Sequence, residues 1–434
     1  SIRIAGIVSL IYCPKQSAPW SAWFAMLPRR LAHSRHNRRK HNSSDAGKRM
    51  KQEHRKMKQW TQRMTAVLMA VLAAFAVSNG ALAEPERDTV EVSAGGAVLM
   101  DARTHKVLYA KTAHEKLPMA STTKVMTAIL AIETGKLDTL VTIPKEAYGV
   151  EGSSMYLRLG EKISLRDLVY GLMLISGNDA AVAIAVHVGG SVAGFAALMN
   201  EKAQALGALN THFVTPNGLH DPNHYTTAYD LALIASYAMQ NGTFREIVGT
   251  TYYRTETGEI TRTIKNKNKL LWEYEGGNGV KTGYTMAAGK CLVFAAEREG
   301  MQLVGVLLNC PDMFPTAKRI LDYGFTAYQP ETLVAAGDII ARARVSGGKK
   351  NALALAAKQD IIILVKDGGA TTVRTVVKVA ERIHAPVAKG EIVGLLEVWE
   401  DGRLLAQTEL FASEPVEPTA FPDYLERLFR RWSV

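Results

Sequence analysis

A long block of helix-type sequence lies between two stretches of strand-type sequence, and this order limits the folds open to the chain. Residues 164–241 are predicted to be helical almost throughout. Apolar runs around a polar turn predict one hairpin over Gly96–Lys111, before the block, and another over Cys291–Asn309, after it. Strands on both sides of the block can join one sheet only if the helices are an insertion on its face. We therefore expect an α+β fold, a sheet domain with an inserted helical lobe and an active site between them.

Hydroxyl residues mark where the expected helices begin. The segment Ser121–Gly135 has hydroxyl residues at its start, apolar residues at helical spacing and a glycine at its end. Ser164 with Asp167, and Thr227 with Asp230, fit the hydroxyl-x-x-acid pattern that satisfies free amides at a helix N-terminus. We expect helices to begin at these three places.

Positive charge is concentrated at the N-terminus. The net charge is +11, but residues 1–83 hold 15 Lys and Arg against two acids. Residues 84–434 therefore hold 37 basic and 39 acidic side chains and are nearly neutral. Since nucleic-acid binding relies on a basic surface, no nucleic-acid partner is expected.

Residues 1–83 have the features of a processing segment. Basic residues precede the uncharged run Thr65–Val77, and Ala81–Ala83 supplies small residues at cleavage spacing. The run is shorter than the roughly 20 residues of a membrane-spanning helix. We expect a secretory signal peptide and an exported protein.

The residues before that run show no periodic pattern. Residues 1–49 are polar and basic, and position 1 is Ser. We therefore expect translation to start at Met50, Met57 or Met64, and residues 1–83 to lie outside the fold.

The C-terminal part is expected to contain a domain and a tail. From about residue 332 to 413, short β-branched segments such as IIILVKDG and TTVRTVVKV are broken by glycine, which predicts a small all-β domain. Residues 421–434 place large apolar side chains on one helical face and charged ones opposite, which predicts an amphipathic helix at the outer face of the cytoplasmic membrane. The expected boundaries are 84–330 for the sheet domain, 331–414 for the β domain and 415–434 for the helix.

The cysteines and the histidine cluster predict no cofactor. Beyond residue 83 only Cys291 and Cys310 remain, which allows one bridge or two buried thiols. The stretch His220–His224 holds two His and an Asp, but Pro and Asn between polar residues favour a turn whose side chains bond the backbone. We expect no metal and no other cofactor.

Ser121 and Lys124 form the first chemical motif. Three residues apart at a helix start, they share one face with Cβ atoms about 5 to 6 Å apart. A serine hydroxyl becomes a nucleophile beside a base, and a lysine amine serves as that base when it is neutral. The spacing is also common by chance, and Ser346 with Lys349 matches it in a Gly-rich loop. The motif therefore needs partners elsewhere in the chain.

Ser176, Gly177 and Asn178 form the second motif, between two predicted helices. One hypothesis is that Ser176 relays a proton between Lys124 and a leaving amine while the Asn178 amide holds the substrate backbone. The alternative is a plain helix junction, in which Asn178 or the next residue caps the second helix.

Lys281, Thr282 and Gly283 form the third motif, at the start of the second β region. An extended strand there can offer its edge to a peptide. Lys281 and Thr282 are predicted to bind a terminal carboxylate, and Gly283 to allow close approach of the ligand. The alternative is a solvated turn. Three such motifs in this order favour function over coincidence.

The set of motifs resembles the serine penicillin-binding proteins and class A β-lactamases. The resemblance is closest to the low-molecular-mass D-alanyl-D-alanine carboxypeptidases and spans about residues 90–325. The stretches that carry it are LPMASTTKVMTA, LMLISGNDAAVAIA, TPNGLHDPNHYTTAYDLA and NGVKTGYTMAAGKCLV. It implies a β-lactamase/transpeptidase-like fold.

This resemblance also implies an activity and roles for residues. The expected activity is removal of the terminal D-alanine from peptidoglycan stem peptides, with β-lactams as covalent inhibitors. Ser121 would form the acyl-enzyme, Lys124 would be the base, Ser176 would assist proton transfer and Lys281 would bind the carboxylate. Many relatives carry His after Lys-Thr-Gly, where this chain has Tyr284, which leaves rate and substrate preference open.

Three alternative functions are open. A D,D-endopeptidase would act on cross-links with the same motifs. A class A β-lactamase would need an acidic residue to activate water, and no convincing Glu-x-x-x-Asn segment lies between Asn178 and Lys281. A non-catalytic wall-binding protein would have no need of a nucleophile with its base.

Overall fold

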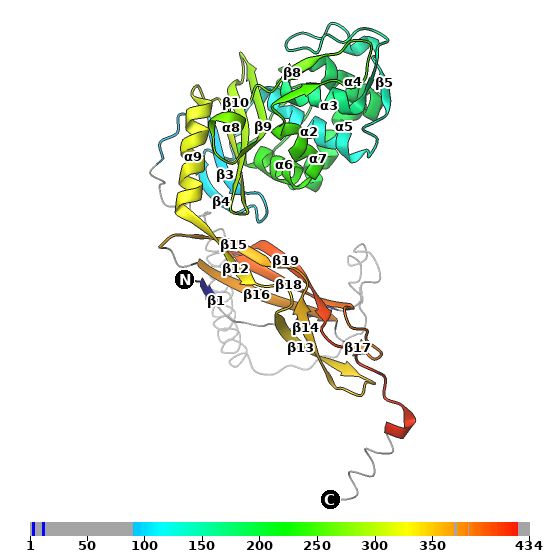
Figure 1. Cartoon of the computed structure of the whole chain (residues 1–434). Coiled ribbons are helices and arrows are strands. Elements are labelled where there is room, and N and C mark those ends of the chain that lie inside the picture. Colours follow the sequence, from blue (N-terminus) through cyan, green and yellow to red (C-terminus); the bar gives the residue numbers. More distant parts are fainter. Residues whose placement is uncertain (1, 5–10, 14–89, 369–370, 381, 424–434) are drawn as a thin grey trace, which may run out of the picture. The chain divides into compact units, whose positions relative to one another are not determined.

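The computed structural model describes residues 2–4, 11–13, 90–368, 371–380 and 382–423 (Figure 1). Its N-terminal sheet is antiparallel, with the strand order β4-β3-β11-β10-β9. The strands are β3 (Gly96–Asp101), β4 (Val107–Lys111), β9 (Gly277–Thr285), β10 (Gly289–Arg298) and β11 (Met301–Leu308). Both predicted hairpins, β3–β4 and β10–β11, are confirmed.

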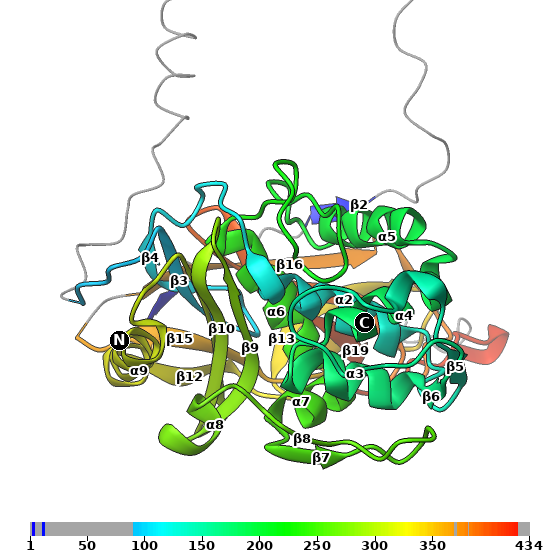
Figure 2. The ribbon, with the colours of Figure 1, turned by 90° about the horizontal axis from the view of Figure 1, so that it is seen from above.

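Helices cover both faces of this sheet. Alternate residues point to opposite sides, so Val98 and Val293 join the core of the helical lobe, while Leu99 and Phe294 join a second core. That second core is covered by α9 (Met313–Ala327), which lies across the sheet from the lobe in Figures 1 and 2. The sequence analysis did not predict α9.

The inserted lobe contains the expected helices. Its elements are η1 (Ala120–Thr123), α2 (Lys124–Glu133), η2 (Lys145–Ala147), α3 (Leu165–Leu174), α4 (Asn178–Gly189), α5 (Val192–Ala205), α6 (Ala228–Gln240) and α7 (Gly242–Gly249). Two short hairpins, β5 (Leu140–Thr142) with β6 (Lys162–Ser164) and β7 (Tyr252–Arg254) with β8 (Thr263–Lys265), lie among them. The short helix α8 (Leu270–Glu273) precedes β9, and its Leu270 is buried in the second core. The predicted caps are confirmed, since Ser164 and Thr227 side chains accept hydrogen bonds from backbone amides three residues on.

The prediction of nearly continuous helix over residues 164–241 was wrong for residues 206–227. Pro216 and Pro222 disfavour helix there, and Gly218 adopts a left-handed φ of +84°. Side chains replace the missing helical bonds, as where Asn200 Oδ1 accepts from the Phe213 amide at 2.7 Å. This irregular segment lies against the turn that bears Ser121.

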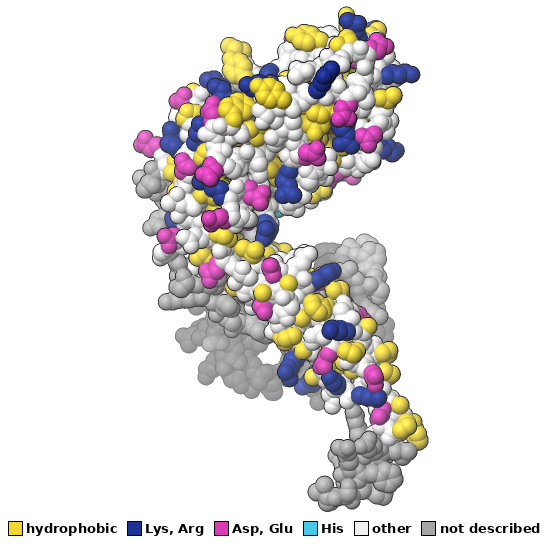
Figure 3. Space-filling view, viewed as in Figure 1, with side chains coloured by type: hydrophobic (Ala, Val, Ile, Leu, Met, Phe, Trp, Pro, Cys, Tyr) yellow, Lys and Arg dark blue, Asp and Glu magenta, His cyan; other side chains and the backbone are white. Residues whose placement is uncertain are grey.

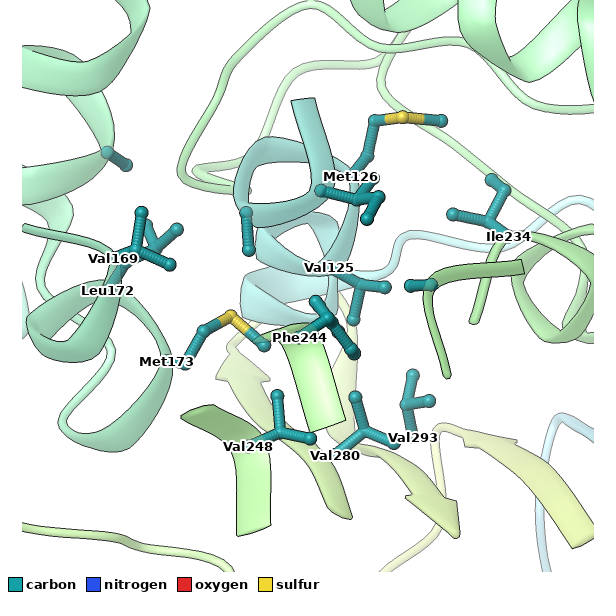
Figure 4. Packing of buried hydrophobic residues seen from close by; sticks show 14 of the residues in the cluster. Val125, Met126, Val169, Leu172, Met173, Ile234, Phe244, Val248, Val280 and Val293 are labelled. Atoms are coloured by element: carbon teal, nitrogen blue, oxygen red, sulfur yellow. The ribbon is translucent and has the colours of Figure 1, made fainter. Parts of the chain in front are cut away.

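The helix α2 forms the centre of the lobe (Figure 4). Its Val125 and Met126 are fully buried and lie among side chains of α3, α6, α7 and the sheet. Phe244 of α7 and Val280 of β9 close the space on the sheet side in Figure 4. A helix held on all sides fixes the orientation of the residues at its first turn.

The all-β domain is confirmed and begins at Tyr328, slightly before the predicted boundary. Its strands are β12 (Tyr328–Val334), β13 (Ile339–Ser346), β14 (Ala352–Ala357), β15 (Ile361–Lys366), β16 (Thr371–Ala380), β17 (Ile383–His384), β18 (Ile392–Glu400) and β19 (Arg403–Ala412). The main sheet runs β16-β18-β19-β14-β13-β17, and β12 pairs with β15. Leu353, Leu355 and Leu410 are fully buried in its core.

The N-terminal residues differ from expectation. Two short strands, β1 (Ile2–Ile4) and β2 (Ile11–Cys13), pair in parallel with β16, although residues 1–83 were expected to lie outside the fold. The uncharged run Thr65–Val77 and the amphipathic stretch from Tyr424 onward lie outside the described residues.

Charge and hydropathy of the described parts are unremarkable. Lys and Arg alternate with Asp and Glu over the face shown in Figure 3, in line with the near-neutral composition of residues 84–434. Among the described residues, no single helix has the length and apolar character to cross a membrane, and α4 with α5 is one bent pair that passes that test by length and composition.

Candidate active site

Ser121 lies in a tight turn at the start of α2. The turn η1 precedes Lys124, the first residue of α2, so the predicted helix begins with a 3-10 turn. Ala120, directly before Ser121, has a left-handed φ of +47°. Thr123 Oγ1 donates to the Ala120 carbonyl at 2.8 Å. Ser121 is half-buried, while its neighbours in the turn are buried.

Lys124 places its amine beside the Ser121 hydroxyl. The Nζ atom lies 2.9 Å from Ser121 Oγ, and it donates to Asn178 Oδ1 at 2.7 Å and to the Asn217 carbonyl at 2.5 Å. A neutral amine has two N–H bonds and one lone pair. Because the two acceptors take the N–H bonds, the lone pair of a neutral Lys124 points toward Ser121.

The surroundings of Lys124 favour the neutral amine. The side chain is fully buried, and burial lowers its pKa well below the usual lysine value. The positive charges of Lys281 and Lys267 lower this pKa further, and Asp179 opposes them. A lysine with a lowered pKa beside a serine hydroxyl can serve as the base that activates a nucleophile.

The Ser176-Gly177-Asn178 motif joins α3 to α4, as predicted. Ser176 is buried and has a left-handed φ of +67°. Asn178 does not cap α4: its Oδ1 accepts from Lys124, and its Nδ2 donates to the Glu151 carbonyl at 2.6 Å. The structure thus brings the Asn178 amide to the Lys124 amine. The predicted contact of Asn178 with substrate stays a prediction.

A loop from residue 151 to 157 is held against the start of α4. Asp179 accepts hydrogen bonds from Ser154 Oγ and from the Met155 and Leu157 amides at 2.7 to 3.1 Å. Asn178 N donates to the Ser153 carbonyl at 2.7 Å. Asp179 therefore fixes the loop, while its charge acts on Lys124.

Lys281, Thr282 and Gly283 lie on β9, the edge strand of the sheet, as predicted. Lys281 is buried, and its Nζ donates to the Thr282 carbonyl at 3.0 Å. Burial, together with the charge of Lys267, lowers the pKa of Lys281 to about 7. Within the described residues, Lys281 forms no ion pair. An anion that enters the site can form an ion pair with the protonated form of this side chain.

Gly283 brings the edge strand up to Ser121. A Cβ on this residue would lie 3.0 Å from Ser121 N and 3.2 Å from Thr122 N. We predicted that glycine here allows a ligand to approach. The structure shows that it first allows β9 to pass close to the turn that bears Ser121, beside α2 in Figure 2.

Sequence reasoning missed three contributors to the site. The Asn217 carbonyl binds Lys124, and a backbone carbonyl has no side-chain signature. Lys267 Nζ donates to Ser153 Oγ at 3.1 Å, and its charge acts on both buried lysines. His224, which was assigned to the predicted turn rather than to the site, lies 2.7 Å from Thr123 Oγ1.

The structure shows how the His220–His224 stretch and the two cysteines are arranged. Asn223 N donates to Asp221 Oδ1 at 2.7 Å, so the predicted turn in His220–His224 is confirmed. In the part of the chain that the structure describes, no group of His, Cys, Asp or Glu is arranged to hold a metal ion. Cys291 and Cys310 are two buried free thiols, which decides between the two possibilities left open.

Comparison with known proteins gives the same picture along the chain. Residues 81–312 match the family described as D-alanyl-D-alanine carboxypeptidase, and residues 328–418 match the C-terminal domain of penicillin-binding protein 5. The chain is 33% identical over 381 residues to the D-alanyl-D-alanine carboxypeptidase DacF of Bacillus subtilis, covering 85% of this chain and 98% of that protein. It is 41% identical over 255 residues to the D-alanyl-D-alanine carboxypeptidase of a Streptomyces species, covering 54% of this chain and 88% of that protein.

Two solved structures have a similar fold. The crystal structure of penicillin-binding protein 5 from Haemophilus influenzae aligns with a TM-score of 0.63 and 32% identity, over 76% of this chain and all of that chain. The Streptomyces K15 DD-transpeptidase aligns with a TM-score of 0.52 and 40% identity, over 55% of this chain and 99% of that chain.

Proposed function

Because the chain belongs to the family of D-alanyl-D-alanine carboxypeptidases, we propose that Ser121 accepts the acyl group and that Lys124 is its general base. The protein is a serine-type carboxypeptidase that removes the terminal D-alanine from peptidoglycan pentapeptide stems through an acyl-enzyme. The observation that carries the residue assignment is the fully buried Lys124 amine 2.9 Å from Ser121 Oγ.

Acylation follows from that geometry. Lys124 Nζ takes the hydroxyl proton as Ser121 Oγ forms a bond to the carbonyl carbon of the penultimate D-alanine. The bond from that carbon to the nitrogen of the terminal D-alanine then breaks, and the proton passes to the leaving amine. Ser176, two residues before the Asn178 that binds Lys124, is the proposed relay for this proton. Water later hydrolyses the ester and restores the Ser121 hydroxyl.

The terminal carboxylate of the substrate is proposed to bind at Lys281 and Thr282. Lys281 is buried without an ion-pair partner among the described residues, and with a pKa of about 7 it is only partly charged. A carboxylate beside it favours the protonated form, so binding the substrate itself completes the charge pair. Gly283 and the Asn178 amide would then border the bound peptide backbone.

Two assays on the purified protein test this function. Incubation with a pentapeptide ending in two D-alanines should release free D-alanine. A labelled penicillin should form a covalent adduct at Ser121, because the lactam imitates the D-alanyl-D-alanine amide. Failure to release D-alanine, with the adduct intact, would favour action on cross-links instead.

We further propose that the protein is exported and attached peripherally to the outer face of the cytoplasmic membrane. The support is the composition of residues 1–83 and the apolar face expected over residues 421–434, of which Phe421 is 75% exposed. Deleting residues 421–434 should release the protein from membrane vesicles while its soluble activity persists. A truncated protein that still sediments with vesicles would show that the tail is not the anchor.

A further inference from the structure

One irregular segment, Thr215–His224, contacts η1 and the first turn of α2, which bear Ser121 and Lys124, at several points. Thr127 Oγ1 donates to the Pro216 carbonyl at 2.6 Å, and Lys124 Nζ donates to the Asn217 carbonyl at 2.5 Å. Gly218 lies so close that a Cβ there would be 1.9 Å from the Ala120 carbonyl oxygen. We call this segment the clamp loop. It touches the residue before Ser121 and the base after it.

His224 ends the clamp loop and has a defined protonation state. The backbone amides of Val214 and Thr215 donate to its Nδ1 at 2.9 and 3.3 Å. Since Nδ1 accepts, the ring proton of a neutral His224 is on Nε2. That Nε2–H donates to Thr123 Oγ1 at 2.7 Å, and the Thr123 hydroxyl donates to the Ala120 carbonyl at 2.8 Å. One chain of hydrogen bonds therefore joins the clamp loop to Ala120.

Ala120 is the residue that needs such support. Its φ of +47° is unfavourable for a residue with a Cβ, so the surroundings have to hold it. Its carbonyl is contacted from two sides, by the Thr123 hydroxyl and by the Gly218 backbone. Ser121 follows directly, so a shift of Ala120 moves the hydroxyl away from Lys124.

We propose that His224 is a positioning residue for acyl transfer, which acts through Thr123 to hold the Ala120–Ser121 turn at the distance from Lys124 that catalysis requires. This proposal rests on the function proposed above, in which Ser121 is the nucleophile. His224 does not touch the substrate in this scheme.

The charges around His224 are consistent with a neutral ring. Burial is the main cause that lowers the pKa of His224, to about 4. Asp221 raises this pKa, while His212, His220 and Lys124 lower it. A second ring proton would have to sit on Nδ1, which faces two backbone amides, so protonation would break the clamp loop's bonds to the ring.

Stopped-flow acylation with a fluorescent penicillin tests the proposal, because it separates the acylation rate constant from non-covalent binding. In His224→Ala the rate constant should fall roughly tenfold to a hundredfold, while the non-covalent dissociation constant changes by less than about twofold. His224→Gln should keep the rate constant within about threefold of the wild type, because the amide oxygen accepts from Val214 and the amide nitrogen donates to Thr123. His220→Gln, on an exposed neighbour in the same loop, is the matched control and should behave as the wild type.

A second pair of variants decides the question if His224→Ala does not fold. Thr123→Val keeps the buried shape but removes the hydroxyl, so its rate constant should fall, and Thr123→Ser should restore it. A folded His224→Ala or Thr123→Val protein that acylates at the wild-type rate overturns the proposal. Loss of the adduct from Ser121→Ala tests the proposed function separately, since adduct retained there would remove Ser121 as nucleophile whatever His224 does.

Discussion

The chain carries the Ser-x-x-Lys spacing twice, in opposite surroundings. Lys124 is fully buried, donates to Asn178 and the Asn217 carbonyl, and has a pKa well below that of an ordinary lysine. Lys349 is exposed and donates to Glu417 at 2.7 Å, which raises its pKa. The same spacing therefore places one lysine where burial favours the neutral amine and the other where an ion pair favours the charged form.

Backbone conformation separates the two serines as well. Ser121 and Lys124 lie on a helical turn, where residues three apart are neighbours. Ser346 ends the strand β13, and its Oγ contacts the Ile383 carbonyl at 3.2 Å and His384 Nδ1 at 2.8 Å. The spacing thus indicates contact only on a helix, and burial decides whether the contact is chemically useful.

The largest expected effect distinguishes the two serines. Ser121→Ala should abolish covalent labelling by penicillin, because the hydroxyl that forms the ester is gone. Ser346→Ala should label like the wild type. The check is gel fluorescence and mass spectrometry of the intact protein, and an adduct on the Ser121→Ala protein would contradict the assignment.

Exchanging each lysine for arginine tests the proposal that Lys124, and not Lys349, acts as a base. Arginine keeps the charge but does not give up its proton, so Lys124→Arg should fold and lose about a thousandfold in acylation rate. Lys349→Arg should acylate normally. In the wild type the rate should rise with pH as Lys124 loses its proton. Near-normal acylation by a folded Lys124→Arg protein would mean that another group takes the proton.

A histidine lies beside each of the two Ser-x-x-Lys segments. Replacing these two histidines should affect the pH dependence of stability differently. The pKa of His224 is about 4 in the folded protein and near 6.5 in the unfolded chain. The unfolded chain therefore binds the proton first as pH falls, and stability that is complete above pH 6.5 declines toward pH 4 by about 3 kcal/mol.

The His224→Gln protein should not show this loss of stability between pH 6.5 and pH 4. The His384→Gln protein, which is changed beside Ser346, should still show it. Urea unfolding at a series of pH values measures the difference. Identical pH dependence in the wild type and His224→Gln would refute the buried neutral histidine.

A smaller effect is expected at the other buried lysine. Lys281 has only to attract a carboxylate, so Lys281→Arg should reduce carboxypeptidase activity by about tenfold rather than abolish it. The loss should appear mainly in KM. A loss as large as that of Lys124→Arg, expressed in kcat, would assign Lys281 a part in proton transfer.

The part of the site that was predictable came from local rules. Helical spacing predicted that Ser121 and Lys124 are neighbours, and a strand pattern placed Lys281–Gly283 after the helical block. The order of the three motifs and the family resemblance singled these residues out. The hairpins and the caps at Ser164 and Thr227 also follow from short-range chemistry.

What was not predictable depends on distant contacts. The Asn217 carbonyl and the charge of Lys267 reach Lys124 only through the tertiary fold. The prediction of nearly continuous helix over residues 164–241 took in the clamp loop, although Pro216 and Pro222 stand within it and a turn was expected at its end. The role of Asn178 as a partner of Lys124 required the same long-range information.

The most direct test is the titration of the two lysines in one sample. Lysine labelled with carbon-13 at Cε gives an NMR shift that reports loss of the amine proton, and Lys124→Arg and Lys349→Arg assign the two signals. Lys124 should titrate well below the ordinary lysine value of about 10.4, and Lys349 above it. A Lys124 signal that titrates together with exposed lysines would contradict the claim that burial makes this residue the base for Ser121.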